Sequence, residues 1–257
     1  MIEIEDWTGR FHHGDSRKVL RSVPNNSVDL VVTSPPYNVN VDYGVFRDDL
    51  DKPEYRLLIR DVFQRLEKIV VESGRVCVNI SLKNDEGVVD TPQIIKEEAY
   101  NFDWNLRFEI VWDKGSSESS SAWGSWRSPS SPRPIFNHEY IFVFDVGEET
   151  KQYEKSIKKE RFMNLVKSVW NVKPETHSEH PAAFPAEIPK RLIELNSYEN
   201  DVVLDPFAGS GTTAVAAEQL NRKWIGIELN QEYIDIAEKR IGNESQNEQN
   251  EMGVFDY

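Results

Sequence analysis

The fold is decided by the stretch Val202-Val203-Leu204-Asp205-Pro206-Phe207-Ala208-Gly209-Ser210-Gly211-Thr212-Thr213. Its first four residues predict a buried strand, and residues 211–220 predict a helix. The glycines between them allow the backbone to turn tightly and to come close to a ligand. A strand, a glycine loop and a helix in this order are typical of a nucleotide-type site in an α/β fold.

The next strand, predicted at 224–228, ends in Glu228. In α/β nucleotide sites, a carboxylate about 20 residues after the loop binds the ribose hydroxyls. Asp205 would repel a pyrophosphate there but would suit the ammonium group of a methionine moiety. The two acids therefore favour S-adenosyl-L-methionine over NAD. The plainer alternative is an ordinary turn in which Ser210 or Thr212 caps the helix.

A second motif, Thr33-Ser34-Pro35-Pro36-Tyr37-Asn38, follows an apolar strand predicted at 28–33. This motif has the groups that methylation of an exocyclic amine on a nucleobase would need. Such an amine is a poor nucleophile, because its lone pair is delocalised into the ring. Acceptors for its N–H groups would localise that pair, and the Ser34 hydroxyl and the rigid Pro35 carbonyl are such acceptors. Tyr37 offers a ring on which an extruded base can stack. The expected catalytic residues are Ser34, Pro35, Pro36 and Tyr37, although a lone Pro-Pro-Tyr is more often a turn.

The rest of the chain alternates predicted strands and helices. This alternation predicts an α/β fold, with a mostly parallel sheet and helices on both faces. The segment 114–137 is too long for a simple connection, so we expect it to be functional or mobile. The polar tail from Gly242 is expected to be disordered. The other predicted strands are 11–15, 75–80, 106–113 and 139–145, and the other predicted helices are 16–23, 54–72, 92–100, 190–197 and 231–241.

The order of the two motifs resembles that of the DNA amino-methyltransferases of the N4-cytosine and N6-adenine type, in their permuted β arrangement. There the Pro-Pro-Tyr motif precedes the cofactor motif, as it does here, and the resemblance runs from about Phe11 to Ile241. It implies a Rossmann-like methyltransferase fold with a small inserted recognition region. Residues 1–145 would form the catalytic half, 146–176 the recognition region and 177–241 the cofactor-binding half.

The resemblance also implies where the cofactor binds. Gly14-Asp15 would lie near its adenine, and the segment 180–185 would lie beside its methionine end. Residues 137–141 resemble the late strand of the catalytic half. No metal site is expected. The expected cofactor-binding residues are Asp15, Phe184, Asp205, Phe207, Gly209, Ser210, Gly211, Thr212 and Glu228.

The residue before Pro-Pro-Tyr bears on the target base. Family members with Ser-Pro-Pro-Tyr mostly methylate cytosine N4, and those with Asp or Asn in place of Ser mostly methylate adenine N6. Ser34 therefore favours cytosine N4, with adenine N6 as the alternative. Methylation of cytosine carbon 5 needs a cysteine nucleophile, and Cys77 lies in mid-strand as a small hydrophobe.

Two further functions remain as alternatives. One is methylation of RNA or of a protein side-chain amide, which the motif order and the basic central segment argue against. The other is an inactive cofactor-binding module that acts only as a DNA-bound partner, which the intact motifs argue against. The sequence leaves open whether a cognate restriction endonuclease accompanies the enzyme, and which oligomer it forms.

The charge of the chain is unusual for a protein that binds double-stranded DNA. Its formal net charge is −14, whereas DNA-binding surfaces are usually basic. Either the acidic residues lie on faces that never meet DNA, or the organism lives in strong salt. Basic residues gather between Lys151 and Lys173, within the region that the resemblance assigns to target recognition. The expected DNA-binding residues are Arg127, Arg133, Lys155, Lys158, Lys159 and Arg161, whereas Tyr153, Phe162 and Trp170 are expected to form a small core.

Composition also bounds the location of the protein. The single cysteine excludes an internal disulfide and fits a reducing compartment. No run approaches the roughly 20 apolar residues of a membrane span. The acidic start of the chain does not resemble a signal peptide. We therefore expect a soluble, cytoplasmic protein that has no membrane partner.

Overall fold

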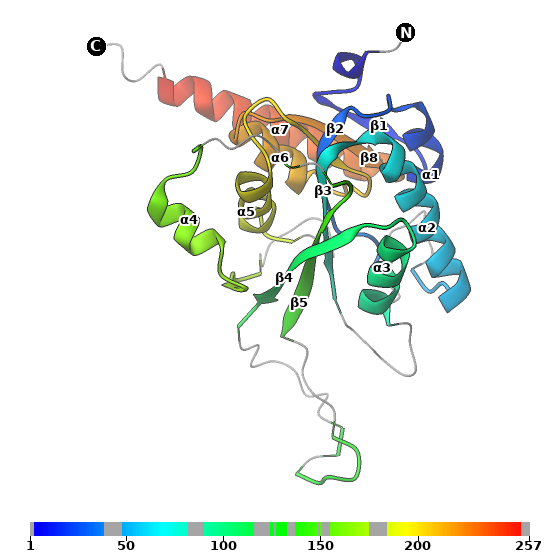
Figure 1. The fold of residues 1–257 in the computed structure, drawn as a ribbon. Helices are drawn as coiled ribbons and strands as arrows, with labels where there is room; N and C mark the ends of the chain where they lie inside the picture. Colours follow the sequence, from blue (N-terminus) through cyan, green and yellow to red (C-terminus); the bar gives the residue numbers. More distant parts are fainter. Residues whose placement is uncertain are drawn as a thin grey trace.

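A computed structural model describes residues 3–38, 48–81, 90–115, 124–125, 127–132, 137–148, 150, 155–174 and 184–252, with backbone alone after residue 242. An eight-stranded sheet in the order β1-β8-β7-β2-β3-β5-β4-β6 forms its centre (Figure 1). All neighbours are parallel except β5, which runs antiparallel to both β3 and β4. The strands are β1 (Arg10–His13), β2 (Val28–Thr33), β3 (Val70–Ile80), β4 (Asn105–Asp113), β5 (His138–Asp145), β6 (Val169–Asn171), β7 (Val202–Asp205) and β8 (Lys223–Glu228).

Helices cover both faces of this sheet, as the sequence predicts. Along β2, Val31 belongs to one apolar cluster and its neighbours Leu30 and Val32 to the other. Residues of α2 and α3 pack in the first cluster, and residues of α5 and α6 pack in the second. The α-helices are α1 (Ser16–Val19), α2 (Lys52–Ile69), α3 (Thr91–Tyr100), α4 (Lys159–Leu165), α5 (Glu187–Asn196), α6 (Thr212–Gln219) and α7 (Gln231–Met252), with short 3₁₀ turns at Ile4–Asp6 and Leu20–Ser22.

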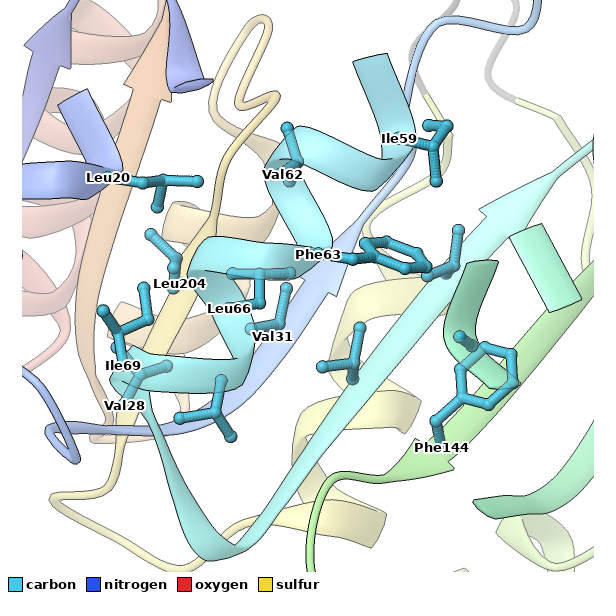
Figure 2. Packing of buried hydrophobic residues seen from close by; sticks show 14 of the residues in the cluster. Leu20, Val28, Val31, Ile59, Val62, Phe63, Leu66, Ile69, Phe144 and Leu204 are labelled. Carbon is cyan, nitrogen blue, oxygen red and sulfur yellow. The ribbon is translucent and has the colours of Figure 1, made fainter. Parts of the chain in front are cut away.

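Helix α2 shows how the sequence sets one of these layers. It begins with a capping box, in which the Asp51 carboxylate accepts from the Glu54 backbone N–H at 2.8 Å. Figure 2 shows its apolar stripe, which includes Ile59, Val62 and Leu66, packed over the central strands. The helix ends at Ile69 rather than 72, because the β-branched Val70 and Val71 begin β3.

Part of the segment 146–176, which is expected to recognise the target, belongs to the main sheet, because β6 pairs with β4 as its edge strand. A three-residue strand is too short to show a period in the sequence. The tail is helical as far as Met252, where disorder was expected. Glu and Gln are good helix formers despite their polarity, so a lack of apolar residues did not exclude a helix.

In the described part of the chain, no helix is both long enough and apolar enough to cross a membrane.

Candidate active site

One pocket lies at the carboxyl ends of the parallel strands β1, β2, β7 and β8, where α/β folds gather their ligands. It encloses about 960 Å³ of empty space, including its wide mouth. Residues from both sequence motifs line it. The lining residues are Asp15, Ser16, Arg17, Ser34, Pro35, Pro36, Tyr37, Leu58, Phe184, Pro206, Phe207, Ala208, Gly209, Ser210, Thr212, Ile227, Glu228, Leu229 and Tyr233.

Most of the residues expected from the sequence therefore meet in this pocket. All four expected catalytic residues and seven of the nine expected cofactor-binding residues line it. The two exceptions are Asp205 and Gly211. Arg17, Leu58 and Tyr233 also line the pocket, although no motif marks them, because each lies on a helix with an otherwise ordinary pattern.

Asp205 lies beneath the pocket wall instead of lining the pocket. It is 3% exposed, and its carboxylate accepts from the Thr33 hydroxyl at 2.7 Å and from the Thr213 hydroxyl at 2.8 Å. The Phe207 backbone N–H also donates to it at 3.0 Å. Burial raises the pKa of Asp205 to about 6. The expectation of direct contact with the methionine ammonium does not fit this geometry, in which Asp205 joins the two motifs.

Gly211 also has a packing role rather than a place in the pocket. Its φ is +79°, a backbone conformation that residues with a side chain rarely adopt. A Cβ atom there would lie 2.7 Å from the Cβ of Ala237 and 2.9 Å from the ring of Phe11. The glycine therefore lets the loop pass close to α7 and β1.

Helix α7 also supports the pocket wall. Arg240 donates from Nη1 to the Ser210 hydroxyl at 3.0 Å and to the Thr212 hydroxyl at 3.2 Å. It donates to the Ser210 carbonyl as well, at 2.7 Å. Arg240 thus holds two expected cofactor-binding residues in place, and nothing in the sequence pattern singles it out.

Glu228 ends β8 on the wall of the pocket. Its carboxylate accepts from the backbone N–H groups of Gly209 and Asn230, each at 2.8 Å. Burial raises the pKa of Glu228 above its usual value, and these two donors act against that rise. A carboxylate offers about four acceptor positions, so capacity remains for the hydroxyls of a ribose.

Asp15 lies at the start of α1 and caps that helix. Its carboxylate accepts from the Arg17 backbone N–H at 3.0 Å and forms an ion pair with the Arg17 guanidinium at 2.6 Å. This partner lowers the pKa of Asp15. An anionic acceptor therefore faces the pocket where the resemblance expects the adenine of the cofactor.

The catalytic motif is held by a hydrogen-bonded network that no sequence motif predicts. The Ser34 hydroxyl donates to the Tyr37 oxygen at 2.8 Å, and the Tyr37 hydroxyl donates to Glu139 Oε2 at 2.7 Å. Asn79 Nδ2 donates to the same two acceptors, at 2.7 and 2.6 Å. Lys114 forms an ion pair with the other oxygen of Glu139. A glutamate beside the apolar run of β5 was the available signal, because a buried charge needs partners.

The backbone after β2 is fixed from a second side. The Tyr55 hydroxyl of α2 donates to the Pro36 carbonyl at 2.9 Å, whereas none of the described residues donates to the Pro35 carbonyl. Asn38, at a φ of 58°, exchanges two hydrogen bonds of 2.7 and 2.8 Å with the backbone of Leu50. Of the two proline carbonyls, that of Pro35 is therefore the one available to a ligand.

The expected DNA-binding residues fall into three groups. Lys155, Lys158 and Lys159 are exposed just before and at the first residue of α4, and Arg127 is exposed in the segment between β4 and β5. Arg161 instead forms ion pairs with Glu187 and Glu194 of α5. A basic residue in a basic run can pair with distant acids, which sequence charge alone does not reveal. Arg133 lies outside the described residues.

The three aromatic residues of the basic segment 151–173 are not all buried together, as a small core would require. Trp170 is a core residue, 1% exposed, and its indole N–H donates to the Leu165 carbonyl. Phe162 is 44% exposed on α4, so its expected place in a small core is wrong. Tyr153 lies outside the described residues.

Comparison with known proteins gives a consistent family. The family model described as DNA methylase, for N6 and N4 methyltransferases, matches residues 28–239. The type II methyltransferase M.Cfr9I of Citrobacter freundii is 32% identical, over 91% of this chain and 88% of its own length. The type II methyltransferase M.XycI of Xanthomonas campestris pv. cyanopsidis is 30% identical over the same shares.

Solved structures agree with this result. The TTHA0409 protein of Thermus thermophilus, complexed with S-adenosyl-L-methionine, matches with a TM-score of 0.73 and 26% identity, over 91% of this chain and 95% of that one. The PvuII cytosine-N4-specific DNA methyltransferase shares the fold, with a TM-score of 0.72, 22% identity and coverage of 88% and 84%. The chain therefore belongs to the N6/N4 DNA methylase family.

Proposed function

We propose that the chain transfers a methyl group from S-adenosyl-L-methionine to the N4 amine of a cytosine in duplex DNA. The observation that carries this proposal is a shared pocket. Ser34 and the Pro35 carbonyl line the same space as Glu228 and Phe207. A donor held by one wall would thus meet an amine held by the other, and a transfer between bound groups gains most from such positioning.

The pocket fits the cofactor chemically. Glu228 offers carboxylate oxygens to ribose hydroxyls, and Asp15 offers another acceptor at the end of β1. Phe184, Pro206 and Phe207 give apolar surface for rings and for the methionine chain. When bound, S-adenosyl-L-methionine supplies an electrophilic methyl group on its sulfonium. The protein then has to orient the amine and accept its proton.

Ser34 supports an amine as the acceptor, through its hydrogen-bond partners. Glu139 accepts the Tyr37 proton, so the Tyr37 oxygen can only accept from Ser34. The single proton of Ser34 is therefore committed to Tyr37. The lone pairs of Ser34 Oγ remain for an amine N–H, and the Pro35 carbonyl is a second acceptor beside them. A serine in this position, before Pro-Pro-Tyr, favours cytosine over adenine.

DNA contact is proposed for the exposed basic residues around α4. Lys155, Lys158 and Lys159 are exposed before and at the start of α4, and Phe162 and Met163 of the same helix are 44% and 56% exposed. Lysines bind phosphates through charge, and exposed aromatic or thioether groups can contact bases or sugars. Arg127, also exposed, is proposed as a contact from the segment between β4 and β5.

Nucleoside analysis tests the choice of base. Plasmid DNA is incubated with the protein and the cofactor, digested to nucleosides, and separated by chromatography coupled to mass spectrometry. We expect N4-methyldeoxycytidine, resolved by retention time from its 5-methyl isomer. N6-methyldeoxyadenosine alone would replace cytosine by adenine as the target. Methylation of RNA or protein with no methylated DNA would refute the proposal.

A further inference from the structure

The network behind Ser34 has a direction, and that direction matters for catalysis. Both hydroxyl hydrogens in it point from the pocket toward Glu139 on β5. Ser34 donates to Tyr37 at 2.8 Å, and Tyr37 donates to Glu139 at 2.7 Å. Glu139 is 3% exposed, so the network ends on a carboxylate that is shielded from bulk water.

From this geometry we infer that Glu139 is the final acceptor of the proton that the target amine loses, and that Ser34 and Tyr37 carry it there. This inference rests on the proposed transfer to an exocyclic amine, and it holds for cytosine N4 and adenine N6 alike. Methyl transfer forms a C–N bond and leaves the C–S electron pair on sulfur. The nitrogen then carries one proton too many.

The proton balance of the relay is simple. The amine N–H proton passes to Ser34 Oγ, while the Ser34 proton passes to the Tyr37 oxygen. The Tyr37 proton passes to Glu139 Oε2, so the two hydroxyl groups end as they began. The net change is a neutral methylated amine and a protonated Glu139. No oxidant and no further reactant is needed.

The surroundings of Glu139 suit an acceptor that must be ionised at the start. Lys114 pairs with Oε1, and Asn79 donates to Oε2 at 2.6 Å. Because Lys114 is paired with Oε1, the Tyr37 hydroxyl contacts Oε2, and Oε2 is the atom that receives its proton. Lys114 and Tyr37 are the titratable described residues that contact Glu139. On β5 itself, His138 and Tyr140 point to the opposite face and hydrogen-bond each other.

A role in orientation alone is the rival explanation, and one pair of variants separates the two. Glu139→Gln keeps an acceptor for the Tyr37 hydroxyl, so it preserves the orientation of Ser34, but it cannot take up a proton. Glu139→Asp keeps the ionisable acid. For a relay, we expect Glu139→Gln to slow single-turnover methylation by about 10²-fold or more and Glu139→Asp to recover part of that rate. Equal rates in Glu139→Gln and the wild type would overturn the inference.

Tyr37→Phe tests the middle of the relay without changing Glu139. It keeps the ring that faces the pocket and removes only the hydroxyl, so a similar loss of rate is expected. Retention of the wild-type rate in this variant would overturn the relay. Cofactor and DNA affinities, measured by calorimetry and by fluorescence anisotropy, should stay within about threefold of the wild type. Affinity losses that account for the whole rate defect would also overturn it.

A matched control is available in Glu98, which is also a buried, ion-paired glutamate. It forms ion pairs with Arg56 and Arg60 between α2 and α3, and none of these three residues lines the pocket. Glu98→Gln should leave the methylation rate unchanged at temperatures where it stays folded; a loss equal to that of Glu139→Gln would assign both effects to the fold and overturn the relay. Nucleoside analysis of the wild-type reaction is run alongside. If wild-type DNA gains no methylated amine, the proposed function fails, whereas activity retained by Glu139→Gln refutes the relay alone.

Discussion

The Thr33 hydroxyl donates a hydrogen bond of 2.7 Å to the Asp205 carboxylate, across 172 positions of sequence. Thr33 is the last residue of β2 and Asp205 the last residue of β7, and the two strands are neighbours in the sheet. This bond therefore couples the loop that carries Ser34 to the loop that carries Phe207 and Gly209. Loss of this hydrogen bond should lower the stability of the fold more than it lowers the rate of methyl transfer.

Thr33→Val should lower the free energy of unfolding by about 1–3 kcal/mol, because a buried carboxylate oxygen loses its donor. Chemical denaturation monitored by circular dichroism measures this change. Thr8→Val serves as the control, since the Thr8 hydroxyl makes only a 3.4 Å bond in an exposed turn. Equal losses in the two variants would show that the bond to Asp205 has no special weight.

The buried Asp205 should make stability depend on pH. Burial raises its pKa from the usual 3.8 to about 6, so between these values the folded chain holds a proton that the unfolded chain has released. The stability from this group is present below pH 3.8 and is lost as the pH rises through about 6, a change of about 3 kcal/mol.

Asp205→Asn removes that dependence. Relative to the wild type, its free energy of unfolding should improve by up to about 3 kcal/mol between about pH 4 and about pH 7, whatever constant offset the substitution adds. Urea denaturation at a series of pH values gives the difference. A difference that does not change with pH would mean that the pKa of Asp205 is not raised.

Ser34→Ala should leave cofactor affinity near the wild-type value and reduce single-turnover methylation by about 10²-fold or more, as the loss of a preorganised polar contact does elsewhere. Calorimetry and a radiolabelled methyl-transfer assay measure the two quantities. Ser22→Ala, in a short 3₁₀ turn outside the pocket, is the control. Turnover that survives in Ser34→Ala would remove Ser34 from the reaction.

The salt dependence of DNA binding separates the lysines of α4 from its arginine. The double variant Lys158→Ala/Lys159→Ala should reduce the slope of log affinity against log salt by about 2, or about 1 per phosphate contact. Arg161→Ala should leave the slope unchanged and lower stability instead, because Arg161 pairs with Glu187 and Glu194. Fluorescence anisotropy at several salt concentrations measures the slope. If Arg161→Ala reduced the slope and the double lysine variant did not, the exposed lysines of α4 would be excluded as the DNA-binding surface.

Two glycines of the cofactor half should respond in opposite directions. Gly211→Ala should destabilise the protein by about 2 kcal/mol or more, since it combines a positive φ with contacts of 2.7 and 2.9 Å. Gly242→Ala has open space around it within α7 and should stabilise by about 0.5–1 kcal/mol. Thermal unfolding of both variants measures the pair. If Gly242→Ala has no effect, the helix beyond Ile241 contributes nothing to stability.

Much of this molecule could be predicted from sequence because its motifs are local. The periodic residues of α2 and the loop at 205–213 carry their own signals, and the fold and the pocket follow from them. Glu139 and Arg161 could not be assigned in this way. Both act through partners at least 25 positions away, and their roles depend on which strands and helices become neighbours. Strand β6 could not be predicted for a different reason, since its three residues are too few to show a period.

Strand β2 separates two sets of strands in the sheet. On one side, β7, β8 and β1 present the groups proposed to hold the methyl donor. On the other, β3 and β5 present Asn79 and Glu139, which govern the acceptor. Apart from the Thr33–Asp205 hydrogen bond at the end of β2, the described residues of the two sets lie on different strands, so donor affinity and base chemistry are expected to vary largely independently. An engineer could therefore redesign the antiparallel side for a different nucleobase while leaving the parallel side, and with it the donor, untouched.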